Sequence, residues 1–180
     1  MLFDTQIADS DEFEATTTPF LDDLFRTAVR ILRNREAAED CVQETYLQAQ
    51  RSFHRFRKGT NCRAWMFTIL FHVVHHHWRK RTWWGVLAED ALTYVPAPNG
   101  VASELKDQEI LRALDALPAK FRDVVLLCDV EEFTYREIQD ILGIPIGTVM
   151  SRLSRARTML RDSLAHRRME NGFLLDSAIA

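Results

Sequence analysis

Cysteine is scarce in this chain, and its placement argues against two common classes of small protein. Only three cysteines, Cys41, Cys62 and Cys128, occur among 180 residues. Their odd number and wide spacing argue against a disulfide framework, and no pair has the CxxC spacing of a metal or redox site. The simplest expectation is a cytoplasmic protein, because thiols stay reduced in that compartment.

Long uncharged apolar runs are also missing. A membrane-spanning helix needs about 18 consecutive apolar residues, and no segment of the chain provides them. The first residues lack a basic stretch followed by an apolar one, so we expect no signal peptide and no membrane insertion. Hydrophobic residues still make up 47% of the chain. That share is enough to build the core of one medium domain or of two small ones.

Acidic residues are absent from one segment, and basic residues gather there. Residues 51–85 contain 8 Lys/Arg and no Asp/Glu, whereas residues 1–50 contain 11 acids and 4 bases. Residues 86–145 are acidic again, with 12 acids against 5 bases, and residues 146–168 carry 6 Arg against only Asp162. One basic island is as easily a solvated surface as a binding site. Two islands, each on its own helical unit, indicate a polyanionic partner.

Apolar residues recur at helical spacing, without strand-like alternation, so we predict an all-α fold. Thr18 is predicted to cap the first helix, with Pro19 at its first position. Asn34 is predicted to cap a second helix, and a loop containing Gly59 leads to a third helix at about 63–81. The inward residues of the first two helices are expected to be Leu21, Leu24, Phe25, Ala28 and Leu32, then Ala38, Cys41, Val42, Thr45, Ala49 and Phe53.

The periodicity fails between the two halves of the chain. Residues 83–103 include Pro96, Pro98, Asn99 and Gly100, which are typical of a linker. Helical spacing then returns, with Pro118 predicted to separate two helices. The inward residues there are Ile110, Leu111, Leu114 and Leu117, then Phe121, Val124, Val125 and Cys128. We therefore predict two small helical domains, at 15–82 and 104–165, joined by a flexible linker at 83–103.

The second domain is predicted to contain a helix-turn-helix unit. Thr134 and Glu137 have the spacing of a capping box, in which the threonine caps the helix and the glutamate returns to the cap. Gly143 fits the left-handed position after a short helix, and Pro145 can begin the next helix. In that second helix, Val149, Leu153, Ala156 and Leu160 recur at core spacing. Thr148, Ser151, Arg152 and Arg155 share an adjacent face that could read DNA bases; the alternative is a surface helix with scattered arginines.

Two sets of motifs resemble one protein family. The segments LPAKFRDVVLL at 117–127, YREI at 135–138 and LGIPIGTVMSRLSRAR at 142–157 are similar to the C-terminal promoter-binding region of extracytoplasmic-function (ECF) sigma factors of bacterial RNA polymerase. In the N-terminal half, AEDCVQETY at 38–46 resembles their polymerase-binding helix. FRKGTNCRAW at 56–65 resembles the loop that reads the downstream promoter element. The resemblance spans roughly residues 20–162.

The resemblance implies a sigma factor that recognises the −35 and −10 elements and helps to melt the promoter of a stress or envelope regulon. Its implied partners are core RNA polymerase, promoter DNA and an anti-sigma factor, and its linker would pass near the polymerase active centre. The residues implied to bind core polymerase are Asp40, Gln43 and Glu44. Those for the −10 element are Phe56, Arg57, Lys58, Thr60, Asn61, Trp65, Arg79, Lys80 and Arg81. Those for the −35 element are Thr148, Ser151, Arg152, Arg155, Arg157 and Arg161.

One residue departs from the family pattern. Met150 stands where the family usually has Lys or Arg, so a phosphate contact is lost or an apolar contact with a thymine methyl replaces it. The residues themselves suggest how the −10 segment would act, because aromatic rings can stack on unpaired bases while basic groups hold the backbone. Among its aromatics, Phe67 and Phe71 are instead expected in the core.

Two other functions compete with this interpretation. An ordinary helix-turn-helix regulator would bind duplex DNA without polymerase, and it would not need the aromatic and basic first domain. A metal hydrolase could use His72, His75 and His76, whose spacing suits zinc. No acid within 51–85 completes such a site, and Cys62 lies several turns away. We therefore expect structural or DNA-facing histidines, no catalytic residue, no metal, no cofactor and no enzymatic activity.

Overall fold

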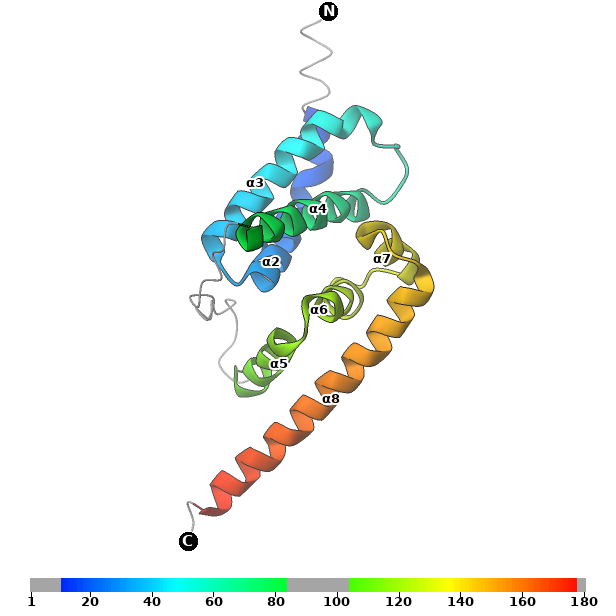
Figure 1. Ribbon diagram of the computed structural model, residues 1–180. Coiled ribbons are helices and arrows are strands. Elements are labelled where there is room, and N and C mark those ends of the chain that lie inside the picture. The colour runs from blue at the N-terminus through cyan, green and yellow to red at the C-terminus, as the bar shows by residue number, and fades with distance from the viewer. Residues whose placement is uncertain (1–10, 84–103, 178–180) are drawn as a thin grey trace, which may run out of the picture. The chain divides into compact units, whose positions relative to one another are not determined.

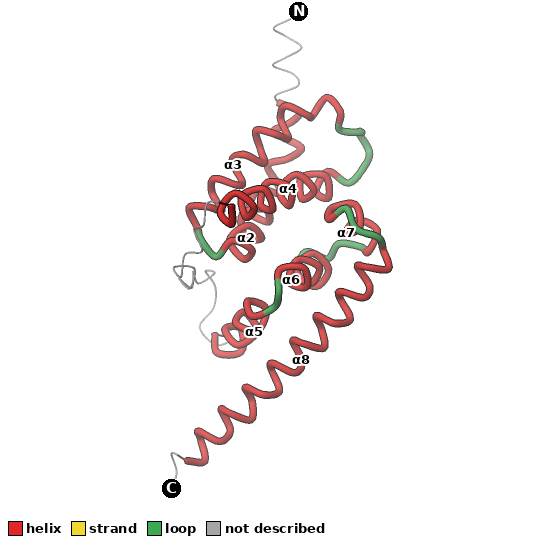
Figure 2. The backbone as a smooth tube through the Cα atoms, viewed as in Figure 1, coloured by secondary structure: helices red, strands yellow, loops and turns green. Residues whose placement is uncertain are grey.

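Helices are the only regular structure in the residues that the structure describes (Figures 1 and 2). This computed structural model describes the backbone at 11–83 and 104–177, and the side chains at 11–79 and 110–165. The predicted all-α class is confirmed. The structure contains two compact units, one formed mainly by the helices before the predicted linker and one formed mainly by the helices after it, and each is described by itself. The predicted linker at 83–103 lies outside the described residues, apart from its first position.

Three long helices form the first unit. They are α2 (Leu21–Leu32), α3 (Arg35–Ser52) and α4 (Cys62–Trp83), with a 3₁₀ turn at Phe53–Arg55 after α3. All three helices pack against one another. Their buried side chains include the following apolar residues: Leu24, Ala28, Ile31, Leu32, Ala38, Cys41, Val42, Ala49, Met66, Phe67, Leu70, Phe71 and Val74. Burying one such Leu, Ile or Phe side chain is worth about 1.5–3 kcal/mol, so this core stabilises the unit.

The start predicted for the first helix is wrong. The backbone is already helical at residues 11–17, and Thr18–Phe20 is a 3₁₀ turn that continues directly into α2. Thr18 therefore caps no helix. Thr17 precedes the turn, and its hydroxyl donates to the Phe13 carbonyl at 2.8 Å instead of capping. Leu21, predicted to face the core, is exposed at the first position of α2, and the buried residues of that helix begin at Leu24.

The turn between α2 and α3 follows the sequence prediction. The Asn34 side chain accepts a hydrogen bond from the Ala37 N–H at 2.7 Å, so the predicted cap of α3 is confirmed. Arg33 precedes it in the left-handed conformation, with φ of 55°, and its N–H donates to the Val29 carbonyl at 2.8 Å. This arrangement satisfies backbone groups at both helix ends. It also directs α3 back along α2.

The second unit consists of shorter helices that pack against one long helix. They are α5 (Glu104–Ala116), α6 (Ala119–Val125) with a π-helical extension at Leu126–Val130, α7 (Tyr135–Leu142) and α8 (Ile146–Ser177). Pro118 is the N-cap residue of α6, as its predicted role between two helices requires. The core lies where α5 and α6 pack against α8. It includes Ala113, Leu114, Leu117, Val124, Val125, Leu126, Leu127, Phe133, Ile138, Ile141, Val149, Leu153 and Ala156.

Ile110 was predicted to face this core and is exposed instead. It lies at the middle of α5, and the buried residues among the described side chains of that helix are Ala113 and Leu114. No helix within the described ranges has the length and hydropathy needed to cross a membrane.

Candidate polymerase and nucleic-acid interfaces

The outer face of α3 carries the residues predicted to bind polymerase. Asp40, Gln43 and Glu44 are all exposed, while Cys41 and Thr45 on the other face are buried. Burial raises the pKa of the Cys41 thiol to about 11, and the carboxylates of Asp40 and Glu44 add to the shift. The thiol therefore stays neutral and belongs to the core. Leu47 was not among the predicted contacts, but it is 47% exposed one turn further along the same face as Asp40, Gln43 and Glu44.

The loop before α4 has a defined backbone (Figure 2). The Thr60 N–H and hydroxyl both donate to the Arg57 carbonyl, at 3.1 and 2.7 Å, which closes a turn. Gly59 lies in this turn with φ of 88°, and an added Cβ would meet no atom within 4 Å. The backbone conformation, and not a lack of space, therefore favours glycine there. The Asn61 side chain then accepts from the Ala64 N–H at 3.1 Å and caps α4.

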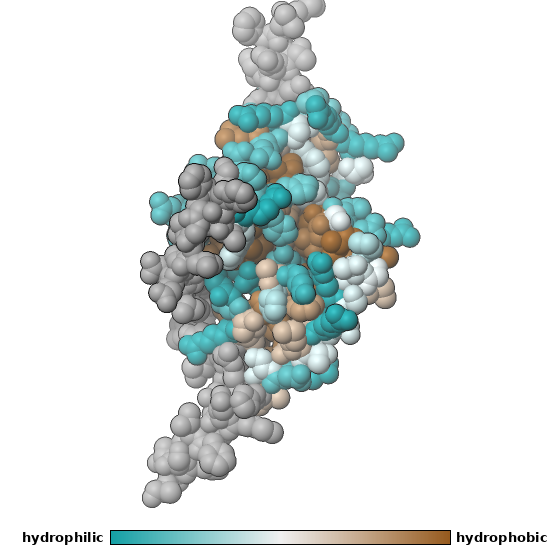
Figure 3. All heavy atoms as spheres, viewed as in Figure 1, coloured by the Kyte–Doolittle hydropathy of each residue, from teal (hydrophilic) through white to brown (hydrophobic). Residues whose placement is uncertain are grey.

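Four of the predicted −10 residues in or next to this turn are exposed. They are Arg57, Lys58, Thr60 and Asn61. On the face drawn in Figure 3, hydrophilic side chains project outward from the first unit. Lys58 forms an ion pair with Glu12 at 2.5 Å, a partner that lies outside the resemblance found in the sequence. The loop thus offers a cluster of polar and basic groups that nucleic acid could reach.

Phe56 and Trp65, the two aromatics predicted to contact the −10 element, are half-buried in a cluster of rings. Their centroids lie 5.0 Å apart, and Phe56 also stacks on Phe53 with centroids 5.8 Å apart and planes 13° apart. The ring of Phe53 contacts Phe13, from the helical segment at 11–17, at 5.3 Å. The ring of Phe56 is therefore part of the packing that supports the loop.

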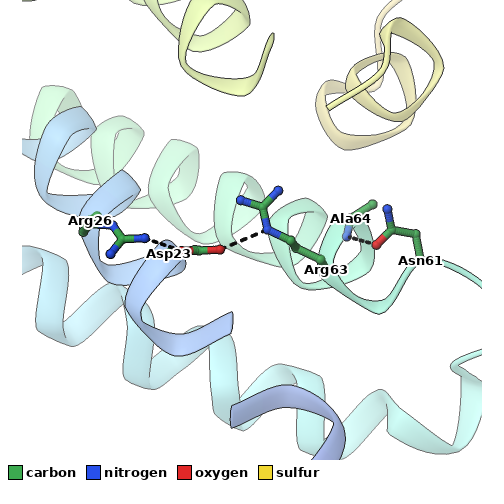
Figure 4. A network of polar contacts seen from close by, with 5 residues as sticks. All are labelled: Asp23, Arg26, Asn61, Arg63 and Ala64. Carbon is green, nitrogen blue, oxygen red and sulfur yellow. Dashed lines mark hydrogen bonds and ion pairs between the residues drawn. The ribbon is translucent and has the colours of Figure 1, made fainter. Parts of the chain in front are cut away.

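The first turn of α4 is tied to α2 by charge (Figure 4). Asp23 of α2 accepts from the Arg63 Nε at 3.1 Å and is also paired with Arg26. The guanidinium of Arg63 lies over the Phe67 ring, 4.9 Å from its centroid. Arg63 is one of the basic residues in the acid-free segment, and its contacts are with the protein. It fixes the position of the helix that follows the loop.

The second half of α4 presents histidines and one tryptophan. His72, His75 and His76 are exposed, and Trp78 is 45% exposed. Among the described residues, no group of three or more His, Cys, Asp or Glu is arranged to hold a metal ion. Phe67 and Phe71 are fully buried, as predicted. Arg79 is exposed, whereas Lys80 and Arg81 lie in α4 with side chains outside the described residues.

The helix-turn-helix predicted for the second unit has the expected local contacts. The Thr134 N–H donates to Glu137 Oε2 at 2.8 Å and the Glu137 N–H to Thr134 Oγ1 at 3.3 Å, so the capping box is confirmed. Gly143 has φ of 63°, which confirms the left-handed turn. Gln139 of α7 then accepts from the Ile146 N–H at the start of α8, at 3.1 Å. These contacts set the direction in which α8 leaves the turn.

The predicted DNA-reading face of α8 is only partly exposed. Val149, Leu153 and Ala156 are buried, while Ser151 and Arg155 are exposed and Thr148 and Arg152 are half-buried. At about 100° per residue, Arg155 lies about 50° from the direction opposite the core, and Arg152 lies about 110° from it. Arg155 is therefore better placed than Arg152 to reach a partner.

Three more exposed residues of α8 bear on the predicted DNA contacts. Ser154 is exposed next to Arg155 and was not among the predicted contacts, although helical spacing places it on the outward side. Met150, which departs from the family pattern, is 54% exposed. Its side chain is therefore an apolar group on the exposed surface of α8. Arg161 is also exposed, one turn beyond Arg157.

Arg157 has a partner within the protein. Its Nη2 and Nε lie 2.5 and 3.2 Å from the two carboxylate oxygens of Asp129, in the π-helical extension of α6. The hydrogen bond and the charge of Asp129 raise the pKa of the guanidinium, which stays protonated in any case. A bidentate pair of this kind fixes geometry as well as charge. The pair joins α8 to the segment that precedes the helix-turn-helix.

Both halves of the chain match family models of one class of protein. Residues 18–84 match Sigma-70 region 2, and residues 107–160 match Sigma-70, region 4. These regions include the exposed face of α3 and the loop before α4, and then the helix-turn-helix. The two matches identify the chain as a sigma factor, and sigma factors are transcription regulators rather than enzymes.

The relatives specify the family. The chain is 36% identical over 137 residues to the ECF RNA polymerase sigma factor EcfG of Rhodopseudomonas palustris, covering 74% of each protein. It is 35% identical over 153 residues to the ECF RNA polymerase sigma factor SigE of Mycolicibacterium smegmatis, covering 80% of this chain and 58% of that protein. The chain belongs to the ECF family of RNA polymerase sigma factors, which act in promoter recognition and transcription initiation.

A solved structure supports the same assignment. The chain is similar to the sigma factor RpoE from Bartonella quintana, whose structure was determined in complex with the anti-sigma factor NepR. The TM-score is 0.71 at 31% identity, covering 86% of this chain and 97% of that one.

Proposed function

We propose that α8 of this sigma factor reads the −35 element, that the loop at 56–61 captures the −10 element, and that the outer face of α3 binds core polymerase. The observation that carries the proposal is the surface of α8. Ser151 and Arg155 are exposed there, opposite Val149 and Leu153, on a helix whose direction is set by a capped helix and a left-handed turn. A helix with such an exposed face can lie in the major groove, with this face toward the bases.

Arg155 is the proposed base-reading residue. Arginine can donate two hydrogen bonds to guanine in the major groove, and a good pair contributes roughly 1–3 kcal/mol of discrimination. Arg152 is half-buried and turned toward the core, which suits a contact at the edge of the interface. Thr148, Ser151 and Arg161 are proposed to hold bases or phosphates nearby. Arg157 would reach the DNA backbone only if it shared its guanidinium with Asp129.

In the first unit, we propose that the loop holds unpaired −10 bases. Arg57, Lys58, Thr60 and Asn61 supply exposed polar groups, and Phe56 and Trp65 supply ring edges from the cluster beneath. Arg79, Lys80 and Arg81 would hold the backbone beyond the loop. We accordingly propose functional domains at 15–82 and 104–165, with the linker at 83–103. Such a protein would help to melt the promoter and not merely bind duplex DNA.

The proposed partners are core RNA polymerase, promoter DNA and an anti-sigma factor. The last is supported by the similarity to RpoE, which was solved with such an inhibitor. Because polymerase and chromosome share one compartment, we propose that the protein acts in the cytoplasm. The proposed targets are the promoters of a stress or envelope regulon.

Selection of promoter sequences tests the proposal. Core polymerase with the wild-type protein, with Arg155→Ala or with Arg152→Ala would each select from promoters randomised at the −35 element. We expect Arg155→Ala to lose its preference at one base position, and Arg152→Ala to retain the wild-type preference. Identical preferences for all three proteins would contradict base reading by Arg155. Equal selection without core polymerase would favour the ordinary helix-turn-helix regulator.

Binding to core polymerase is tested separately on α3. The double variant Asp40→Lys with Glu44→Lys should weaken binding, because it reverses both exposed carboxylates of the proposed contact. Asp22→Lys, which reverses an exposed carboxylate on α2, is the control. If the folded double variant binds as tightly as the control, the contact lies elsewhere.

A further inference from the structure

A helical segment precedes the part of the chain that matches the family models. Residues 11–17 are helical, whereas the match to region 2 begins at residue 18. One side chain of this segment, Phe13, is only 4% exposed. A large side chain with so little exposure belongs to the core of the first unit. Residues 11–17 are therefore packed into the unit and do not merely lead into it.

Phe13 begins a continuous row of aromatic contacts that ends in the loop at 56–61. Its ring meets Tyr46 and Phe53 edge-on, at centroid distances of 5.9 and 5.3 Å. Phe53 stacks on Phe56 at 5.8 Å, and Trp65 closes the row 5.0 Å from Phe56. Phe56 is the first residue of the loop and Trp65 lies in the first turn of α4. The row thus supports both ends of the loop.

Polar contacts hold the segment at two further points. The Tyr46 hydroxyl of α3 donates to the Thr17 carbonyl at 2.8 Å. The Thr17 hydroxyl donates to the Phe13 carbonyl, also at 2.8 Å, inside the protein. At the other end, Glu12 pairs with Lys58 of the loop. Phe13 is therefore fixed relative to α3 on one side and to the loop on the other.

We propose that Phe13 is a positioning residue for capture of the −10 element. It contacts no base; it holds Phe53, and through Phe53 it sets where Phe56 and Trp65 present their rings. If the loop already has the conformation that it needs for binding, less conformational entropy is lost when it captures bases. The inference rests on the proposed function of the loop, and it adds a residue outside the family match to that function.

The experiment compares promoters that differ only in whether the −10 element is base-paired. Transcription by core polymerase is measured on duplex templates and on templates already opened at this element, well below the unfolding temperature of each variant. The variants are Phe13→Ala, the milder Phe13→Leu, and Ile31→Ala as a control. Ile31 is also buried, but it lies near the end of α2, far from the loop. The helix between them, α3, has 18 residues and is about 27 Å long.

Phe13→Ala should lower the duplex-to-opened ratio of activity by about 3- to 10-fold, the factor expected from losing one or two ring contacts. Phe13→Leu should fall between Phe13→Ala and wild type, because it refills the space without the ring edges. Ile31→Ala should keep the wild-type ratio even where it lowers the unfolding temperature. If both Phe13 variants keep the wild-type ratio, or if Ile31→Ala lowers it equally, the positioning role is overturned.

A loop variant separates this failure from failure of the proposed function. Asn61→Asp retains a good cap for α4 while it places a negative charge in the loop. It should lower the duplex-to-opened ratio if the loop captures bases. A normal ratio for Asn61→Asp would overturn the function of the loop itself. A reduced ratio for Asn61→Asp, together with normal ratios for the Phe13 variants, would overturn only the inference about Phe13.

Discussion

The two proposed DNA-binding surfaces differ in how they relate to the cores beneath them. On α8, buried Val149 and Leu153 stabilise the second unit, while Ser151 and Arg155 face away from it. In the first unit, Phe56 and Trp65 serve both purposes, because the rings proposed to meet DNA also pack on Phe53. A regular helix separates stability from recognition by periodicity alone. A loop has no such periodicity, so its shape comes from its turn hydrogen bonds and from the packing of its aromatic rings.

This difference predicts how each unit responds to substitution. In the second unit, a change should affect either stability or DNA reading. In the first unit, changes at the ring cluster should affect both. Four experiments test the comparison, in order of expected size.

The largest effect is expected in the core of the second unit. Leu153→Ala removes a side chain that is 2% exposed, and such substitutions typically cost about 2–5 kcal/mol. Arg155→Ala, two residues further on, should change stability by less than about 0.5 kcal/mol, as exposed substitutions usually do. Chemical denaturation of both variants measures the contrast. A large loss of stability in Arg155→Ala would mean that the two faces of α8 are not separate.

In the first unit, we expect one substitution to affect both stability and DNA recognition. Phe56→Ala should cost about 1–3 kcal/mol of stability, less than for a fully buried phenylalanine because the ring is half-buried. The same variant should also impair transcription from duplex promoters. Arg57→Ala, in the exposed part of the loop, should impair transcription with little change in stability. Normal stability of Phe56→Ala would show that the ring cluster does not support the unit.

The thiol of Cys41 provides a probe of the first unit alone. Its pKa is raised to about 11 from an ordinary 9.0, so between pH 9 and 11 the unfolded chain loses this proton and the folded chain keeps it. Stability therefore falls as the pH rises through this window, by about 1 kcal/mol at pH 10. Other groups titrate in the same range, so the measurement is the difference between the wild type and Cys41→Ala. Equal alkaline slopes for the two proteins would refute the shift.

The smallest effect concerns the exposed pair of Glu12 and Lys58. Exposed ion pairs are worth about 0.2–1 kcal/mol, so Glu12→Gln should barely change the unfolding temperature. Freed from its partner, Lys58 should bind a single-stranded −10 oligonucleotide about twofold more tightly at low salt, and the gain should disappear at high salt. Glu14→Gln removes the same charge from the same segment as a control. If Glu14→Gln increases the affinity for the oligonucleotide equally, the effect comes from net charge and not from the release of Lys58.

Local rules explain why much of the fold was predictable from the sequence. Caps and turns depend on residues only a few positions apart. The predicted contact or conformation is present at Asn34, at Thr134 with Glu137, and at Gly143. The buried faces of α3 and α8 follow from helical periodicity in the same way. The exposed positions of Asp40 and Arg155 then follow from those of their buried neighbours.

Contacts between distant residues were not predictable in this way. Phe13 and Phe53 are 40 positions apart, and Asp129 and Arg157 are 28 apart, so no local spacing indicates either pair. Thr18 and Pro19 have the form of a helix start, but Phe13 packs in the core and holds a helical segment in front of them. Here tertiary packing overrode a local signal.

The two faces of α8 also bear on how a family of such proteins diversifies. Residues that specify a sequence can change without a loss of folding if they make no contact with the core. Ser151, Ser154 and Arg155 meet that condition, while Val149, Leu153 and Ala156 preserve the helix position beneath them. A duplicated gene could therefore acquire a new promoter preference by single substitutions on α8, each remaining within the stability margin of a small domain. The loop before α4 lacks this freedom at Phe56 and Trp65, so its preference should change more slowly.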